Sequence, residues 1–261
     1  MRLMIKFFDR YKTFFAIMTG ISSVILLLFY NALKPEEKLP VYQPASVNYE
    51  LVDQSLQHIK KFHKIGSFSL TNQNGLNVTE QDFKDKIYIA DFFFTTCPGI
   101  CPKMTANMGL IQEALKEDNQ VKLVSFSVTP EIDSVPQLKK YAIEKGVIDS
   151  KWNLLTGDKK HIYDLARKSF FAAKNDGDGG KNDMIHTENF ILVDPDKRIR
   201  GFYDGTDTSE MKSLLYDIRV LKKEYPVFNF ISVDKFWNVI SLLLLFKIIL
   251  DSDPVKSAKI W

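Results

Sequence analysis

This chain of 261 residues has few cysteines and almost no excess of charge, and each shortage excludes a class of protein. Its two cysteines cannot form the disulfide framework that stabilises small secreted domains. Its 35 basic and 32 acidic residues give a formal net charge of only +3, and the basic residues are scattered along the chain. We therefore expect no nucleic-acid partner. With no internal repeat, the length suits one well-buried domain with appendages.

The longest stretch without a charged residue lies near the N-terminus, where Lys12 and Lys34 enclose 21 uncharged residues. As a helix, residues 13–33 would be about 31 Å long, which matches a bilayer core of about 30 Å. Basic residues precede this stretch, and Glu36 and Glu37 follow it, which favours an N-terminus in the cytoplasm. We therefore predict one N-terminal transmembrane helix that places the rest of the chain outside.

This anchor is expected to be retained in a bacterial cytoplasmic membrane, with the domain facing the periplasm or the cell exterior. Only twelve residues precede the apolar stretch, too few for the transit peptide of an organelle. A cleaved signal peptide is the alternative. It is disfavoured because no clear A-x-A cleavage site follows the stretch, and because no cysteine is available there for lipidation.

The chain divides into four regions by composition. Residues 1–33 form the cytoplasmic N-terminus and anchor, and residues 34–65, which contain three prolines, form a tether. Residues 66–225 form the domain, and residues 226–261 form a C-terminal tail. The tail contains an apolar segment, 236–250, that is short for a bilayer span. We expect an interfacial or packing helix there, with a second crossing or a poorly ordered tail as alternatives.

Within the domain, segments with the pattern of strands alternate with segments with the pattern of helices. Asn74-Gly75 predicts a β-hairpin, and apolar runs of strand length at 87–95 and 121–129 flank a helical stripe over 104–118. Further helices are predicted after Pro136, over 159–171 and over 209–224, and further strands over 189–194 and 198–203. This order predicts an α/β domain with a central, mostly parallel sheet, helices on both faces and an N-terminal β-hairpin.

Both cysteines lie in one short motif at the end of a predicted strand, which is where α/β sheets place their sites. Pro102 suits the first turn of the following helix. The N-terminus of a helix stabilises a thiolate, so we expect the pKa values of Cys97 and Cys101 to be lowered. The three residues between them keep the sulfurs close enough to bind one ion or to close a disulfide. This motif therefore predicts a metal-binding or redox site.

The candidate third ligand is His186, which precedes the predicted strand 189–194 and follows the polar, glycine-rich stretch 173–181. That stretch is expected to be a mobile loop that can move the imidazole onto or off a metal. Two thiolates and one imidazole suit three-coordinate Cu(I), whereas Zn(II) normally takes a fourth ligand. We therefore predict a copper cofactor, bound as Cu(I), with Cu(II) as an alternative oxidation state. The remaining histidines are expected to be solvated, and two methionines of the helical stripe to be core: His58, His63, His161, Met104 and Met108.

Asp91 is a charged residue inside an apolar strand, six positions before Cys97. Burial would raise the pKa of Asp91 and let it exchange protons near the thiols. It resembles the buried acid of thioredoxins, which has the same offset from the first cysteine. The alternative is an acid that is satisfied by a local hydrogen-bond donor or by solvent.

At this point the residues resemble those of the Sco/SenC family of copper-binding assembly factors for cytochrome c oxidase, from about residue 66 to residue 225. The most specific element is the T-x-C-P-x-x-C-P pattern that ends at Pro102, and the pairs Pro130-Glu131 and His186-Thr187 support it. The resemblance implies a thioredoxin fold, a single membrane anchor, and a copper ion held by Cys97, Cys101 and His186. One departure is Thr129, which stands where an Asp commonly precedes the Pro-Glu pair.

The resemblance also implies the partner. The chain would metallate the binuclear copper site of cytochrome c oxidase subunit II, or first reduce that site's cysteines, and the copper donor is unknown. A second hypothesis is a membrane-anchored thiol-disulfide oxidoreductase or thiol peroxidase, with Cys97 attacking and Cys101 resolving. Its relatives favour two residues between the cysteines and need no distant imidazole, so we favour the copper chaperone. A copper or redox sensor that signals by docking is a third hypothesis.

Overall fold

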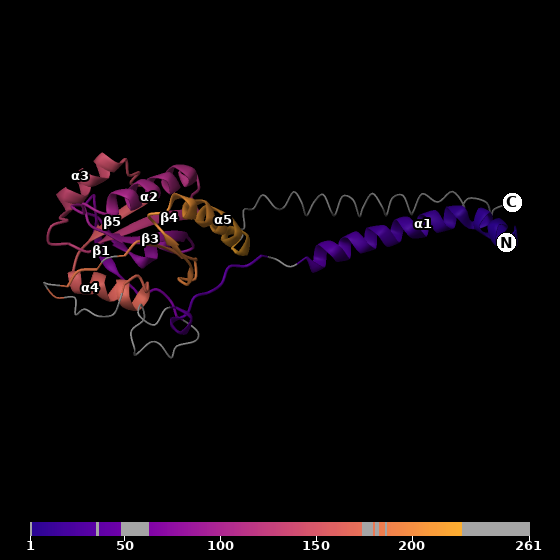
Figure 1. Cartoon of the computed structure of the whole chain (residues 1–261), viewed down its shortest axis with the longest axis horizontal. Coiled ribbons are helices and arrows are strands. Elements are labelled where there is room, and N and C mark those ends of the chain that lie inside the picture. Colours follow the sequence, from indigo (N-terminus) through magenta and orange to yellow (C-terminus); the bar gives the residue numbers. More distant parts are fainter. Residues whose placement is uncertain are drawn as a thin grey trace, which may run out of the picture. The chain divides into compact units, whose positions relative to one another are not determined.

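The computed structural model of the protein describes residues 2–34, 37–47, 63–173, 180, 183–185 and 187–225. The chain forms two compact units, Met1–Leu39 and Pro40–Trp261. The first unit is helix α1 (Arg2–Leu33), in which the apolar side chains from Val24 to Tyr30 are exposed (Figure 1). Over the described residues, no helix combines the length and the apolarity needed to cross a bilayer.

The second unit is built on a sheet that, among the described residues, has seven strands in the order β2-β1-β5-β4-β3-β6-β7. The strands are β1 (Ser69–Asn72), β2 (Asn77–Thr79), β3 (Ile87–Phe93), β4 (Val121–Ser127), β5 (Trp152–Thr156), β6 (Asn189–Val193) and β7 (Ile199–Asp204).

The predicted mostly parallel sheet is wrong, because the sheet is mixed. Strand β4 pairs in parallel with β3 and with β5, whereas the other four pairings of the described strands are antiparallel. The pairs β1–β2 and β6–β7 are joined by short turns, which force antiparallel neighbours. Strand β6 has the near-continuous apolar run typical of a strand covered on both faces, yet it pairs antiparallel with both of its neighbours.

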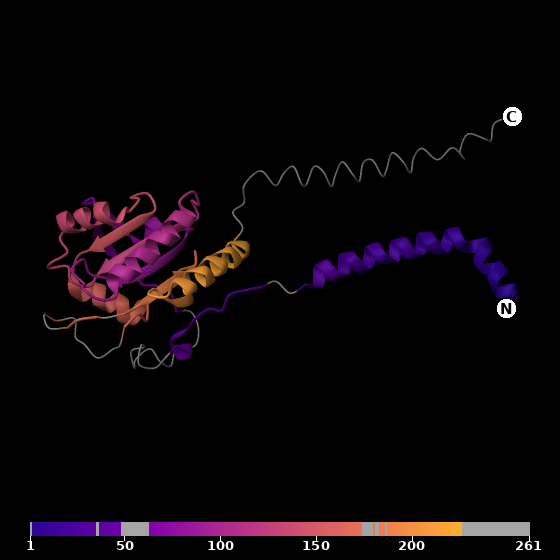
Figure 2. The same cartoon turned by 45° about the horizontal axis from the view of Figure 1, so that its top comes forward.

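Helices cover both faces of this sheet, as predicted (Figures 1 and 2). One face carries α2 (Cys101–Leu115), α3 (Val135–Lys145) and α5 (Thr208–Glu224), and the other carries α4 (Lys159–Asp164). The α2 face buries Met104 and Met108 completely, so the prediction that both are core residues is confirmed. The α4 face packs Tyr163 with Phe92 and Phe126 in one apolar cluster.

Several helix ends follow the sequence signals. Thr79 and Asp82 form a capping box at the start of a 3-10 helix, η3 (Glu80–Phe83). Helix α3 ends at Gly146 in the left-handed conformation, with φ 68°, as glycine allows. The helix predicted over 159–171 is divided, since α4 gives way to a π-helical segment, η4 (Leu165–Ser169).

Residues 40–47, which the sequence assigns to the tether, pack against β7. They include a short 3-10 helix, η1 (Pro44–Ser46). The Tyr42 N–H donates to the carbonyl of Ile199 at 2.9 Å, and the Tyr42 ring meets Phe202 edge-on. The Arg200 guanidinium donates to the carbonyl of Pro40 at 3.0 Å. The edge of the sheet at β7 is thus covered by the segment that leads to the domain.

The expectation of a solvated His63 is wrong. Its Nε2 lies 2.8 Å from the carbonyl oxygen of Ser169, and its ring lies 4.4 Å from that of Phe171. Burial lowers the pKa of His63, against a smaller opposing effect of that carbonyl. His58 lies outside the described residues, as does the apolar segment 236–250.

Candidate metal centre

Cys97 lies on the loop that connects β3 to α2, and Cys101 is the first residue of α2, as the motif predicts. Strand β3 ends at Phe93 and α2 begins at Cys101, with Pro102 in its first turn. Cys101 is buried, with 4% of its surface exposed, and Cys97 is partly exposed; both are free thiols. Of the two thiols, Cys97 is therefore the more accessible to solvent and to a partner.

The two thiols differ in acidity, which corrects the expectation that both pKa values are lowered. Burial alone would raise the pKa of Cys97, but the backbone N–H groups of Cys101, Gly99 and Ile100 and the Cys101 thiol outweigh it, so that this pKa is lowered. Burial, together with the neighbouring Cys97, raises the pKa of Cys101 to about 12. The reason is that the helix begins at Cys101, so its N–H groups face Cys97 while the Cys101 side chain enters the core.

The acid in β3 is buried and also has a local donor, so the structure combines the two alternatives that the sequence left open. Asp91 is 2% exposed, and the hydroxyl of Ser125 donates to its Oδ1. Ser125 in turn accepts a hydrogen bond of 2.8 Å from Nε1 of Trp152. Burial raises the pKa of Asp91 to about 7, and the charge of Asp91 contributes to the raised pKa of Cys101.

A second buried acid, Asp133, supports the loop that carries the cysteines, and sequence reasoning missed it. Its carboxylate accepts hydrogen bonds from Thr95, two residues before Cys97, and from Ser127 and Thr129. The visible signal was the pair of hydroxyl residues at alternate positions, 127 and 129, because alternate residues of an extended chain share one face. Hydroxyls inside an otherwise apolar strand indicate a buried acceptor opposite them.

His186, the predicted third ligand, lies outside the described residues, but the chain just before it is held firmly. Asp183 forms two hydrogen bonds with the Arg167 guanidinium, of 2.7 and 2.8 Å. Both side chains of this pair are nearly inaccessible to solvent, with exposures of 6% and 8%. A paired, two-point contact of this kind fixes direction as well as distance.

A tyrosine fixes the same segment at the end of the sheet where the cysteine loop begins. The Tyr163 hydroxyl lies 3.0 Å from the carbonyl of Asp183 and 3.0 Å from that of Val128, just beyond the end of β4. Val128 itself donates to the carbonyl of Phe93, the last residue of β3, at 2.9 Å. The chain leading to His186 and the loop carrying Cys97 therefore start from neighbouring points, at the carboxyl ends of the central strands β3 and β4.

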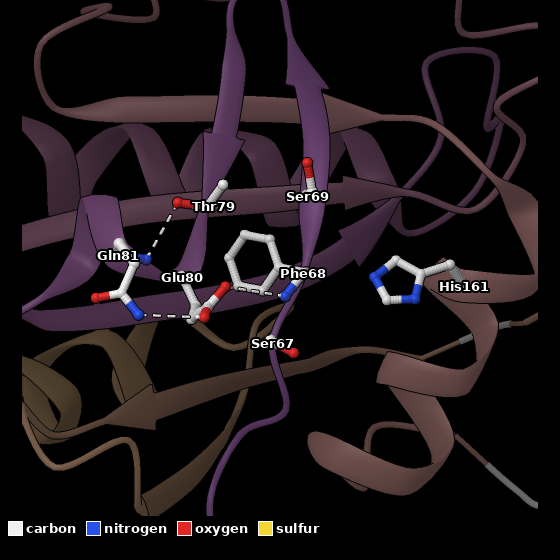
Figure 3. Close-up of a pocket in the computed structure, with 7 residues that line it drawn as sticks. All are labelled: Ser67, Phe68, Ser69, Thr79, Glu80, Gln81 and His161. Atoms are coloured by element: carbon white, nitrogen blue, oxygen red, sulfur yellow. Dashed lines mark hydrogen bonds between the residues drawn. The ribbon is translucent and has the colours of Figure 1, made fainter.

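The described residues alone do not complete a metal site. Among them, no group of three or more His, Cys, Asp or Glu side chains is placed to hold an ion. The two thiols supply two soft ligands, which suit Cu(I) better than a hard cation such as Ca²⁺ or Mg²⁺. His161 does not join them: it lines a separate surface pocket with Phe68, Thr79 and Glu80 (Figure 3).

The domain is similar in sequence and in structure to several known proteins. The SCO1/SenC family model matches residues 56–221. The SCO1 protein homolog of Bacillus subtilis (strain 168) is 36% identical over 159 residues, which are 60% of this chain and 82% of that protein. The crystal structure of a SCO1/SenC family lipoprotein from Bacillus anthracis str. Ames aligns with a TM-score of 0.55 and 33% identity, over 61% of this chain and 95% of the other.

A further structure is that of BsSco, described as a member of the Sco family of cytochrome c oxidase assembly proteins in which a disulfide switch was identified. It aligns with a TM-score of 0.54 and 35% identity, over 63% of this chain and 95% of the other. The range matched by the family model contains both cysteines, His186 and every described strand of the sheet.

Proposed function

This chain belongs to the SCO1/SenC family and has its thioredoxin-like fold, and from that premise we propose that it is a copper chaperone that holds Cu(I) with Cys97, Cys101 and His186. The observation that carries the proposal is the arrangement at the carboxyl ends of the central strands β3 and β4. Two free thiols lie there, one on the loop after β3 and one at the start of α2, and the chain leading to His186 is fixed beside the start of that loop.

The chemistry of these side chains agrees with a chaperone for Cu(I). Two sulfurs and an imidazole form a soft, three-coordinate set, which leaves the ion open to a fourth ligand from an acceptor. The lowered pKa of Cys97 favours the thiolate that a metal requires, and its partial exposure lets an incoming ligand reach the ion. Copper would leave by ligand exchange, one protein ligand at a time.

We propose the binuclear copper site of cytochrome c oxidase subunit II as the recipient. BsSco, which is 35% identical over the aligned region, is described as belonging to a family of cytochrome c oxidase assembly proteins. The present chain would deliver Cu(I) to that site, or reduce the cysteines of the site before copper enters it.

The proposed ligand set is tested by exchanging two histidines separately. Full-length protein carrying His186→Ala should bind Cu(I) far more weakly than the wild type in competition with a chromophoric chelator. His161→Ala is the matched control, because His161 lines a separate pocket and should leave the affinity unchanged. Equal losses in the two variants would remove His186 from the ligand set.

A second function, thiol-disulfide exchange, is favoured by the difference in acidity between the cysteines. A thiolate at Cys97 beside a protonated Cys101 is the division that an attacking and a resolving thiol need. The disulfide switch described for BsSco points the same way. Metal-free protein that reduces insulin disulfides at the rate of a thioredoxin would favour this function over copper delivery.

We further propose that α1 attaches the domain to the bacterial cytoplasmic membrane, with the domain on the outer side. The support is the row of exposed apolar side chains along this helix. The relative from Bacillus anthracis is described as a lipoprotein. Attachment of a family member to a membrane therefore has a precedent, although a lipoprotein is attached by a lipid and not by a helix.

A further inference from the structure

The carboxylate of Asp133 is fully buried in the loop between β4 and α3, and hydroxyl and amide groups surround it. The Thr95 hydroxyl donates to Oδ1 at 2.6 Å, and the Thr95 N–H donates to Oδ2 at 3.2 Å. The hydroxyls of Ser127 and Thr129 donate to Oδ2 at 2.6 and 3.1 Å. Among the described residues, the hydrogen bonds to this carboxylate come from Thr95, Ser127 and Thr129.

Thr95 is held at two atoms, and this fixes the direction in which the cysteine loop leaves β3. The Thr95 hydroxyl accepts a hydrogen bond of 2.9 Å from Nε2 of Gln137, so its own hydrogen is free to point at Asp133. Because the backbone N–H bonds to the same carboxylate, the residue can neither rotate its side chain nor turn its peptide without losing a bond. Cys97 follows two residues later, and its N–H closes a turn on the carbonyl of Phe94.

The other donors connect the carboxylate to a rigid part of the fold. Ser127 is the last residue of β4, a strand hydrogen-bonded on both sides in the middle of the sheet. Thr129 follows it in the loop toward α3, and its N–H donates to the Ser127 hydroxyl at 3.2 Å. Asp133 therefore joins the start of the cysteine loop to the centre of the sheet through its two oxygens.

We propose that Asp133 is a positioning residue for the Cys97–Cys101 site, and that it acts through Thr95. By fixing Thr95 it holds the loop so that both sulfurs reach one ion, or one another, without reorganisation. The copper part of this inference rests on the proposed function. A carboxylate suits this site because both of its oxygens accept; in Asp133→Asn, either orientation of the amide turns an N–H toward at least one of the four donors.

The same change, threonine to valine, made at two different positions distinguishes a positioning role from a structural one. Thr95→Val and Thr129→Val each remove one hydroxyl that donates to Asp133, but only Thr95 belongs to the chain leading to the cysteines. In full-length reduced protein, Thr95→Val and Asp133→Asn should weaken Cu(I) binding about tenfold or more, as loss of a partner behind a metal ligand commonly does. Thr129→Val should weaken it less than about threefold, while urea unfolding shows a loss of stability for both threonine variants.

A double substitution tests whether Asp133 acts through Thr95. If it does, Thr95→Val combined with Asp133→Asn should weaken Cu(I) binding no more than the stronger single change. Fully additive effects would overturn this link, and equal copper affinities for Thr95→Val and Thr129→Val would overturn the positioning role itself. Should Asp133→Asn fail to fold, the threonine pair decides alone.

A readout without copper keeps this inference separate from the proposed function. The equilibrium between the Cys97–Cys101 disulfide and glutathione depends on how close the loop holds the two sulfurs. Thr95→Val should shift this equilibrium toward the dithiol by about tenfold, and Thr129→Val should not. If wild-type protein binds no Cu(I), the proposed function fails, and the same shift still supports positioning. If both variants match the wild type here and in copper binding, the inference fails.

Discussion

Replacing Asp91 with asparagine should remove most of the pH dependence that this buried acid gives to folding. Burial raises the pKa of Asp91 from 3.8 to about 7, so the folded chain binds this proton more tightly than the unfolded chain. The stability that results is fully present below about pH 4 and is lost as the pH rises through about 7. A difference of about 3 units corresponds to at most about 4 kcal/mol. The Asp91→Asn variant would keep the hydrogen bond from Ser125, because an amide oxygen also accepts.

The assay is urea unfolding of full-length, reduced, metal-free protein between pH 5 and pH 8. Across this interval the free energy of unfolding of the variant should rise by about 2 to 3 kcal/mol relative to that of the wild type. The reason is that the wild-type carboxylate becomes charged in the folded state there, and the variant lacks it. Asp85→Asn is the matched control, since the same chemical change at an exposed acid should leave the pH profile unaltered. Parallel profiles for the wild type and Asp91→Asn would contradict the link between this buried acid and the pH dependence of folding.

Two further predictions concern the segment before His186 and the N-terminal helix. Arg167→Leu removes the guanidinium from the buried carboxylate of Asp183 and should lower the free energy of unfolding by about 3 kcal/mol or more, measured by urea unfolding. A change below about 1 kcal/mol would contradict the conclusion that this buried pair stabilises the fold. Deletion of residues 2–33 should move the protein from the membrane fraction to the soluble fraction of cells, measured by sedimentation and immunoblotting, and unchanged sedimentation would contradict the role of α1.

Features that depend on neighbouring residues could be predicted from the sequence. The turn at Asn74-Gly75, the cap at Thr79 and the C-terminal glycine at 146 each follow from the conformations that those residues allow. The position of the cysteines between a strand and a helix also followed, because a buried run and a first-turn proline bracket them.

Features that depend on residues far apart in the chain could not be predicted. Apolar periodicity does not encode strand direction, so the pattern of β6 does not indicate that this strand pairs antiparallel to β3. Asp133 and Thr95 are 38 positions apart, and no local pattern connects them. The unequal acidity of the thiols depends on the residue at which α2 begins, and sequence signals place a helix end only to within a few residues.

The proposed function depends above all on one Cu(I) being held by two sulfurs and one imidazole nitrogen. This ligand set can be observed by X-ray absorption at the copper edge of full-length protein loaded with one equivalent of Cu(I), together with the copper content per chain. We expect one copper per chain, with two sulfur ligands and one nitrogen ligand that disappears in His186→Ala. A shell without sulfur, or a nitrogen ligand that persists in His186→Ala, would contradict it.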